Sequence, residues 1–162
     1  MAATRPAWTD RGSTSRTSAL PVGIVSVAIT VVGLAVSIYL TVQHYTASAT
    51  LACPENALIN CAEVTASSYS KVAGVPVALL GTVYFVGMAL LCLPQAWRLR
   101  RLDAVRILGA AAGVVWSLWF VWVELLRLDA ICLWCTVVHI STLALLGAVL
   151  WTTTGLLGAP TR

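Results

Sequence analysis

Residues 130–157 read AICLWCTVVHISTLALLGAVLWTTTGLL and contain no Asp, Glu, Lys or Arg. The run is longer than the roughly 20 apolar residues that a helix needs to cross a bilayer. It also opens with a Cys-x-x-Cys pair, Cys132 and Cys135. This stretch therefore predicts a transmembrane helix with a pair of thiols at its beginning.

Three more apolar stretches of similar length come earlier in the chain, and Arg106 is the only charged residue in them. They are Val22–Tyr45, Val72–Trp97 and Ala104–Val123. Backbone groups inside lipid must pair within their own segment, so helices are expected in spite of the many Val, Ile and Thr residues. The sequence predicts helices at about residues 22–45, 72–97, 104–124 and 130–152.

The composition agrees with a membrane protein. Of the 162 residues, 59% are hydrophobic and 10% are charged, whereas about 25% are charged in a soluble domain. The mean hydropathy is +0.89. The fold class predicted is therefore an all-α membrane protein, a four-helix transmembrane bundle over residues 20–157. Residues 1–19, rich in Thr, Ser, Ala and Arg, are predicted to be a disordered tail.

The basic residues predict the orientation in the membrane. Most of them lie before the first apolar stretch or around the connection between the second and third, and only Lys71 and Arg127 lie elsewhere among the connections. The positive-inside rule places both termini, including residues 158–162, in the cytoplasm. The connections Thr46–Lys71 and Glu124–Asp129 then face outward. This distribution explains the net charge of +4 without nucleic acid as a partner. The expected location is the plasma (inner) membrane, crossed several times.

A second pair of cysteines, Cys53 and Cys61, lies in the first outward connection. Pro54, Asn56 and Asn60 favour a loop there. A separation of eight residues leaves room for a disulfide, provided that the Cα atoms come within about 5.5 Å. The four cysteines of the two pairs therefore fall on the outward side, where disulfides persist. The loop pair is either a structural disulfide or a mobile pair that passes electrons onward.

The C-x-x-C pair has several possible roles. A position at the start of a helix favours the thiolate, which is the attacking species in disulfide exchange. His139 lies one turn after Cys135 on the same face, and an ionisable residue inside a membrane segment indicates function. Alternatively, Cys132, Cys135 and His139 form half of a zinc site that Cys53 and Cys61 would complete. Cysteines that are fixed and purely structural are a further possibility.

Aromatic residues on the third predicted helix suggest a cofactor. Trp119 lies near a helix end, where an aromatic belt at the membrane interface is the ordinary explanation. With Trp116 and Phe120, it would instead form walls for a flat, ring-shaped cofactor.

With its cysteines in this order, the chain resembles the vitamin K epoxide reductase family over roughly Leu20–Trp151. The matching features are four apolar segments, Cys53 and Cys61 in an outward loop, and Ser67 six residues later. To these are added Gly74-Val75-Pro76 at the start of the second helix and Cys132-Leu-Trp-Cys135 at the start of the fourth. The other quinone-linked family, the DsbB type, places its C-x-x-C in the first outward loop, unlike this chain.

The resemblance implies a thiol–disulfide oxidoreductase with a short half-buried segment in its outward loop. Cys53 would exchange with an outside dithiol protein and Cys61 with Cys132. Cys135 would react with a quinone, menaquinone or ubiquinone, from the membrane pool. The protein would thereby oxidise a thioredoxin-like (DsbA-type) partner and support disulfide formation in exported proteins. An alternative within the family is reduction of vitamin K epoxide or quinone by the same cysteines.

The resemblance also implies a set of quinone-binding residues. Ser67 would help to position the quinone from the half-buried segment. His139 stands where animal members usually have a Tyr that hydrogen-bonds the quinone. Val77 follows Pro76 where many members have Asn, a departure that bears on how the quinone is held. Many bacterial members also carry a fused thioredoxin-like domain after the fourth helix, whereas this chain ends at Arg162, so a separate partner protein is expected.

Overall fold

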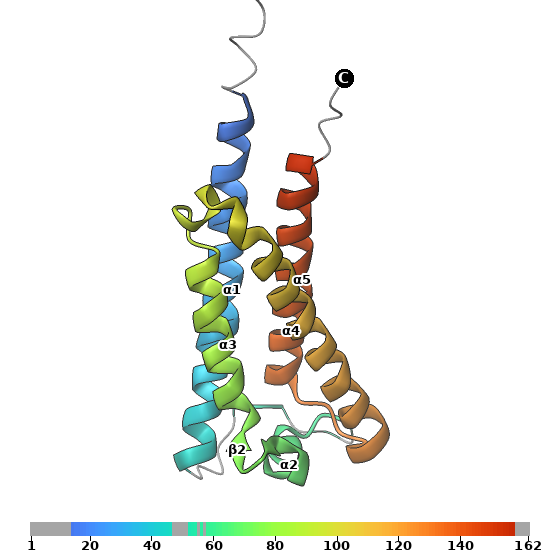
Figure 1. Cartoon of the computed structure of the whole chain (residues 1–162). Coiled ribbons are helices and arrows are strands. Elements are labelled where there is room, and N and C mark those ends of the chain that lie inside the picture. The colour runs from blue at the N-terminus through green and yellow to red at the C-terminus, as the bar shows by residue number, and fades with distance from the viewer. Residues whose placement is uncertain (1–13, 47–51, 55, 57, 158–162) are drawn as a thin grey trace, which may run out of the picture.

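The computed structural model describes residues 14–46, 52–54, 56 and 58–157. Within these residues, four helices run side by side (Figure 1): α1 (Thr14–Thr46), α3 (Val77–Leu91), α4 (Asp103–Val123) and α5 (Leu133–Leu157). α1 packs against α3 and α5, and α4 packs against α5 and α3. The start of α1, the end of α5 and the connection between α3 and α4 lie at one end of the molecule, and α2 (Cys61–Ala66) lies at the other.

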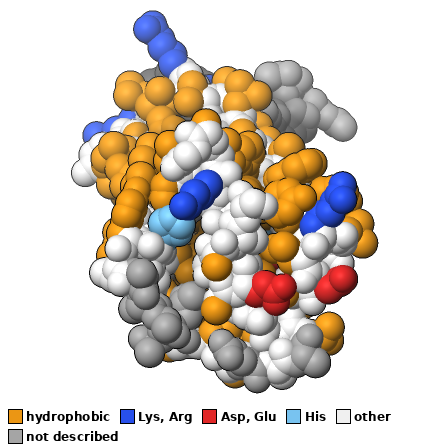
Figure 2. Space-filling view, turned by 90° about the horizontal axis from the view of Figure 1, so that it is seen from below, with side chains coloured by type: hydrophobic (Ala, Val, Ile, Leu, Met, Phe, Trp, Pro, Cys, Tyr) orange, Lys and Arg blue, Asp and Glu red, His pale blue; other side chains and the backbone are white. Residues whose placement is uncertain are grey.

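The helices have the lengths and composition of a membrane protein. In the described part of the chain, three segments are long and apolar enough to cross a bilayer: Gly23–Thr46, Arg100–Leu128 and Leu133–Thr153. α3 is a shorter apolar helix of 15 residues, about 22 Å long, against a hydrocarbon thickness of roughly 30 Å. Figure 2 shows hydrophobic side chains around the perimeter and only a few charged ones on the end that carries α2. The prediction of a mainly helical protein with membrane-spanning segments is confirmed at this level, with three candidate spans and one shorter apolar helix in the described residues.

α3 is shorter than the helix predicted over residues 72–97. The beginning of that stretch forms an antiparallel hairpin of β1 (Lys71–Val72) and β2 (Val75–Pro76). Its two turn residues, Ala73 and Gly74, have φ values of 51° and 82°, as a two-residue hairpin turn requires. At the other end, Cys92 caps the helix and Pro94 follows it, a common place for proline. The prediction from hydropathy was too long because hydropathy does not reflect the turn preferences of Gly74 and Pro94.

Short elements complete the chain. α1 extends back to Thr14, into the segment predicted as a tail, whose first 13 residues lie outside the described part, as do residues 158–162. One-turn 3₁₀ helices are η2 (Ser68–Ser70), η3 (Ala96–Arg98) and η4 (Arg100–Leu102). A π-helical turn, η5 (Glu124–Leu128), extends α4 and ends at Asp129, which has a left-handed backbone conformation.

Small and hydroxyl-bearing residues join the helices. The ring of Phe85 on α3 rests against Gly33 of α1, where an added Cβ would lie 2.3 Å from a ring carbon. Ser117 on α4 and Thr142 on α5 share a hydrogen bond of 2.8 Å. Helices in lipid associate through such close approaches and interhelical hydrogen bonds, because apolar surface alone gives no preference for protein over lipid.

Arg106 organises the connection between α3 and α4. Its side chain is fully buried, donates to the carbonyl oxygen of Leu91 at 2.7 Å and to that of Ala96, and pairs with Asp103. Its guanidinium also lies 4.3 Å from the ring centroid of Trp97. Arg106, the one charged residue within the apolar stretches, therefore holds this turn together through several interactions.

Replacing Arg106 with Ala should destabilise the fold. The carbonyl oxygens of Leu91 and Ala96 would lose a charged donor, at a cost of about 3 kcal/mol in unfolding free energy. Thermal denaturation in detergent should show a Tm lowered by several degrees. Arg101→Ala, an exposed arginine in the same connection, is the matched control and should leave the Tm unchanged. An equal Tm for the two variants would contradict a stabilising role for Arg106.

Candidate active site

The loop predicted to face outward carries a disulfide between Cys53 and Cys61, with a Cα–Cα distance of 6.2 Å. Cys61 is the first residue of α2, which begins there because the Asn60 side chain accepts a hydrogen bond of 3.0 Å from the Glu63 N–H. The Asn56 side chain accepts from the N–H groups of Leu58 and Ile59, both at 2.9 Å. The Asn residues that predict a loop thus also shape it around the disulfide.

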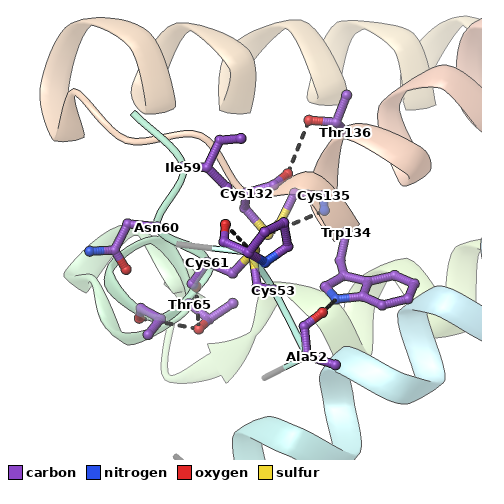
Figure 3. Close-up of a disulfide and its surroundings, with 12 residues drawn as sticks. Ala52, Cys53, Ile59, Asn60, Cys61, Thr65, Cys132, Trp134, Cys135 and Thr136 are labelled. Carbon is purple, nitrogen blue, oxygen red and sulfur yellow. Dashed lines mark hydrogen bonds between the residues drawn. A yellow bond between two sulfur atoms is a disulfide. The ribbon is translucent and has the colours of Figure 1, made fainter. Parts of the chain in front are cut away.

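Backbone pairing joins this loop to the segment before the C-x-x-C. Ile59 and Ile131 form an isolated parallel bridge, in which the Ile131 N–H donates to Leu58 at 2.8 Å and the Asn60 N–H donates to Ile131 at 3.1 Å. In parallel pairing, the residues that follow on each side run next to each other. Figure 3 accordingly shows the sulfur atoms of Cys61 and Cys132 gathered in one place. The structure thus brings the two predicted cysteine pairs together.

Cys132 directly precedes α5, and both Cys132 and Cys135 are free thiols. The Cys135 backbone N–H donates to the Cys132 sulfur at 3.2 Å. The pKa of Cys132 is lowered, chiefly because the Cys135 thiol donates a hydrogen bond to its sulfur, with backbone N–H groups at the helix start adding to the effect. Cys132 is therefore the thiol of this pair that more readily forms the thiolate, the form that enters or leaves a disulfide during exchange.

Trp134, the third residue of the C-x-x-C, holds the loop in place. Its indole N–H donates to the Ala52 carbonyl at 3.0 Å, next to Cys53. The Ala52 N–H in turn donates to the Tyr39 hydroxyl at 3.2 Å, and the rings of Tyr39 and Trp134 lie 5.0 Å apart. Figure 3 shows Trp134 reaching from the C-x-x-C to the loop. A Cys-x-x-Cys pattern assigns no role to its two middle residues, so this contact of Trp134 was not predicted.

The four cysteines differ in their access to the surroundings. Cys61 and Cys132 are both 0% exposed, whereas Cys53 is partly exposed. Cys135 is the member of the four that lines a cavity of about 410 Å³ between the helices. Two of the four sulfurs are thus buried, one is at the surface of the molecule, and one faces the interior of the bundle.

The cavity has mostly apolar walls and a few polar groups. Of the residues predicted to bind a cofactor, Ser67, Val77 and His139 line it. Trp119 does not: its side chain is 53% exposed and stacks on Trp122, with 5.1 Å between ring centroids. The helical period turns Trp119 away from the face that carries the other two predicted aromatic residues, Trp116 and Phe120, and these two do line the cavity.

Two polar residues of the cavity, Tyr84 and Glu124, were not predicted from the sequence as functional residues. The hydroxyl group of Tyr84 is buried, has no hydrogen-bond partner among the described residues, and lies against Gly113, where an added Cβ would be 2.2 Å away. Glu124 also lines the cavity, and its carboxylate accepts a hydrogen bond of 3.4 Å from the Cys132 N–H. Tyr84 lies in a continuous apolar run and Glu124 lies near the predicted membrane surface. The residues next to them in the sequence therefore do not indicate a functional role for either.

The described residues contain no group of three or more His, Cys, Asp or Glu side chains arranged to hold a metal ion. The sulfurs of Cys53 and Cys61, which a zinc site would have recruited, are bonded to each other in this structure.

A disulfide and a free C-x-x-C dithiol thus lie close together at one end of a bundle of apolar helices, an arrangement that suits a thiol-based oxidoreductase of the membrane. The chain belongs to the vitamin K epoxide reductase family, whose model matches residues 24–150. The matched range includes all four cysteines and the cavity residues named above, which confirms the resemblance seen in the sequence. No curated protein matches the chain.

Proposed function

We propose that the protein is a quinone-dependent thiol–disulfide oxidoreductase that oxidises a thioredoxin-like protein outside the plasma membrane. The observation that carries the proposal is the order of the four sulfurs. Cys53 is partly exposed at the surface, Cys61 and Cys132 are buried close to each other, and Cys135 lines the cavity. Such an order supports electron transfer from an external dithiol to a molecule in the bundle.

The orientation proposed is the one that places the cysteines outside. Four helices cross the membrane in a bundle, both termini lie in the cytoplasm, and the α2 end faces outward. The support comes from the basic residues of η3, η4 and the start of α4, which lie at the same end as the start of α1 and the end of α5 (Figure 1). Basic residues concentrate on the cytoplasmic side.

Thiol exchange along this order needs no further cofactor. An external dithiol reduces the Cys53–Cys61 disulfide, and the Cys61 thiolate then attacks Cys132 of an oxidised C-x-x-C, releasing Cys135 as a thiolate. Cys53 attacks Cys61 in this mixed disulfide and releases Cys132. The loop disulfide is restored, and the two electrons now reside on two C-x-x-C thiols. The free Cys132 and Cys135 beside a closed Cys53–Cys61 disulfide correspond to this final state.

The cavity residues fit a quinone ring. A volume of about 410 Å³ lies within the range of small-molecule sites. The unpartnered Tyr84 hydroxyl supplies a donor that an oxygen atom of a ligand would satisfy, and His139 and Ser67 add polar groups on other elements. Trp116 and Phe120 would hold the faces or edges of a ring. When bound, a quinone supplies an acceptor for two electrons and two protons.

Quinone reduction by the purified protein tests this function. A reduced thioredoxin-like protein would be supplied in detergent with either a menaquinone or a ubiquinone analogue, and hydroquinone formation would be followed by absorbance. We expect reduction that depends on both the membrane protein and the thiol donor, and that saturates with one class of quinone. A folded protein with free access to its thiols that reduces neither quinone would refute the proposal.

Tyr84→Phe should weaken quinone binding. The missing hydroxyl removes one hydrogen bond to the ligand, so we expect KM for quinone to rise about 10-fold, with kcat nearly unchanged. The Tm of the ligand-free variant should not fall, because the hydroxyl is buried without a partner. Tyr45→Phe, at an exposed tyrosine outside the cavity lining, provides the control. An unchanged KM would show that Tyr84 does not contact the quinone.

A further inference from the structure

Glu124 is a buried carboxylate next to the C-x-x-C. The thiol exchange described above assigns no role to this carboxylate. It is 4% exposed and belongs to the π-helical turn η5. Its carboxylate accepts the 3.4 Å hydrogen bond from the Cys132 N–H, and its own carbonyl accepts from the Ala130 N–H at 3.2 Å. Single π-helical turns within helices are frequent at functional sites. The turn here places Glu124 at the base of the redox pair.

No cation in the described part of the chain neutralises this carboxylate. The only salt bridge found there joins Arg106 to Asp103 in the distant connection, and Arg127 of the same turn lies over the ring of Trp122. A buried carboxylate without a cationic partner costs several kcal/mol of folding free energy. An aliphatic residue would fill the position without this cost, so the carboxylate indicates a chemical role.

The other titratable groups near Glu124 define what it would exchange protons with. Cys132 and Cys135 come from α5, and His139 and His44 line the same cavity from α5 and α1. Glu63 of α2 is exposed and hydrogen-bonded to Asn60 instead. The two thiols are therefore the proton donors at hand when the C-x-x-C is oxidised.

We propose that Glu124 is the proton acceptor for the Cys132–Cys135 dithiol. This inference rests on the proposed function and deepens it. Closing the disulfide breaks two S–H bonds, forms one S–S bond and releases two electrons and two protons. These match the two electrons and two protons that reduction of a quinone consumes. Glu124 takes the proton of Cys132 at its carboxylate, passes it into the cavity that it shares with Cys135, and ends unchanged. The proton of Cys135, which lines the cavity itself, passes directly to the quinone there, so that both protons are taken up.

The burial of the thiols explains why an acceptor is needed. Cys61 and Cys132 are both 0% exposed, so bulk water does not reach the Cys132 sulfur to remove its proton. A side chain that transfers a proton in place of water contributes about 10²–10⁴-fold to a rate. Glu124 lies on the cavity side of Cys132, the side towards which the proton must move.

Glu124→Gln separates the charge from the shape of the side chain. The first readout needs no quinone: site-resolved alkylation of the fully reduced protein as a function of pH. Glu124 raises the pKa of Cys132, opposing the larger lowering by the Cys135 hydrogen bond. Removal of its charge should therefore move the midpoint of Cys132 alkylation to lower pH. The exposed Glu63→Gln should leave this midpoint in place.

The second readout is single-turnover oxidation of the reduced C-x-x-C by quinone. We expect Glu124→Gln to slow it about 100-fold, although Cys132 is more readily deprotonated in the variant. Glu124→Asp keeps the carboxylate and should restore most of the rate, and it also serves if the Gln variant does not fold. A wild-type rate in Glu124→Gln, or an Asp variant as slow as the Gln variant, would overturn the role of Glu124.

These readouts distinguish the proposal from the function on which it rests. A wild-type protein that reduces no quinone would refute the proposed function alone. In that case, the alkylation profile decides: a shifted midpoint in Glu124→Gln supports proton coupling between Glu124 and the dithiol, and an unshifted midpoint overturns it.

Discussion

Cys135→Ser should abolish quinone reduction, with a loss of about 10⁴-fold or more, down to the uncatalysed background. Cys135 is the cysteine that lines the cavity, and a serine hydroxyl is neither redox-active nor acidic enough to replace its thiol. The assay is hydroquinone formation with saturating reduced partner. Cys92→Ala is the matched control: Cys92 is also a buried free cysteine, but it lies at the other end of α3, and its removal should leave the rate unchanged.

The same variant should also accumulate a trapped intermediate. Without Cys135, Cys132 has no resolving partner in its own pair, and its nearest sulfur neighbours are those of the loop (Figure 3). We expect a Cys61–Cys132 mixed disulfide, identifiable by peptide mass spectrometry without reduction. Quinone reduction that survives in Cys135→Ser, or Cys132 found bonded mainly to Cys53, would contradict the order of electron transfer proposed above.

The second large effect is expected from Cys53→Ser, which should stop electron transfer from the proposed partner protein. Cys53 is the partly exposed member of the loop disulfide, whereas Cys61 is fully buried, so an external thiol protein has no other sulfur to attack. Quinone reduction driven by the reduced partner should fall by at least about 10³-fold. Single-turnover oxidation of a pre-reduced C-x-x-C by quinone should keep its wild-type rate.

The comparison of these two rates shows which step the Cys53→Ser substitution affects. A structural defect in Cys53→Ser would lower both rates, whereas loss of the exchange step alone lowers only the rate driven by the partner. A relay in which Cys53 is only a structural anchor predicts partner-driven reduction close to that of wild type. The variant therefore tests whether the loop disulfide is mobile or fixed, the question that its sequence left open.

The sequence predicted what depends on composition and on local order along the chain. The apolar stretches become helices, and the spacing of Cys53 and Cys61 allows the disulfide that the structure contains. The ends of α3 were not predicted, because a hydropathy window cannot weigh Ala73 and Gly74 in a turn against their apolar neighbours. Local conformational preferences decided those boundaries.

The cavity was harder to predict because it results from packing between elements that are distant in sequence. Tyr84 and Glu124 become notable only when α3, α4 and α5 come together around them. The same holds for Trp119: its residue type suited a ring-binding wall, but the rotation of α4 decides that Trp116 and Phe120 take that place. The contact of Trp134 with Ala52 likewise joins positions 82 apart in the chain, beyond the reach of any local motif.

The complete burial of Cys61 and Cys132 has a consequence for the cell. In the proposed orientation, soluble thiols outside the membrane reach the partly exposed Cys53, whereas the sulfurs of Cys61 and Cys132 are shielded from them. A small thiol would therefore reduce the C-x-x-C only by way of the Cys53–Cys61 disulfide. For the proposed oxidoreductase, such shielding would keep the redox state of the C-x-x-C coupled to the quinone even where the surroundings are rich in small thiols.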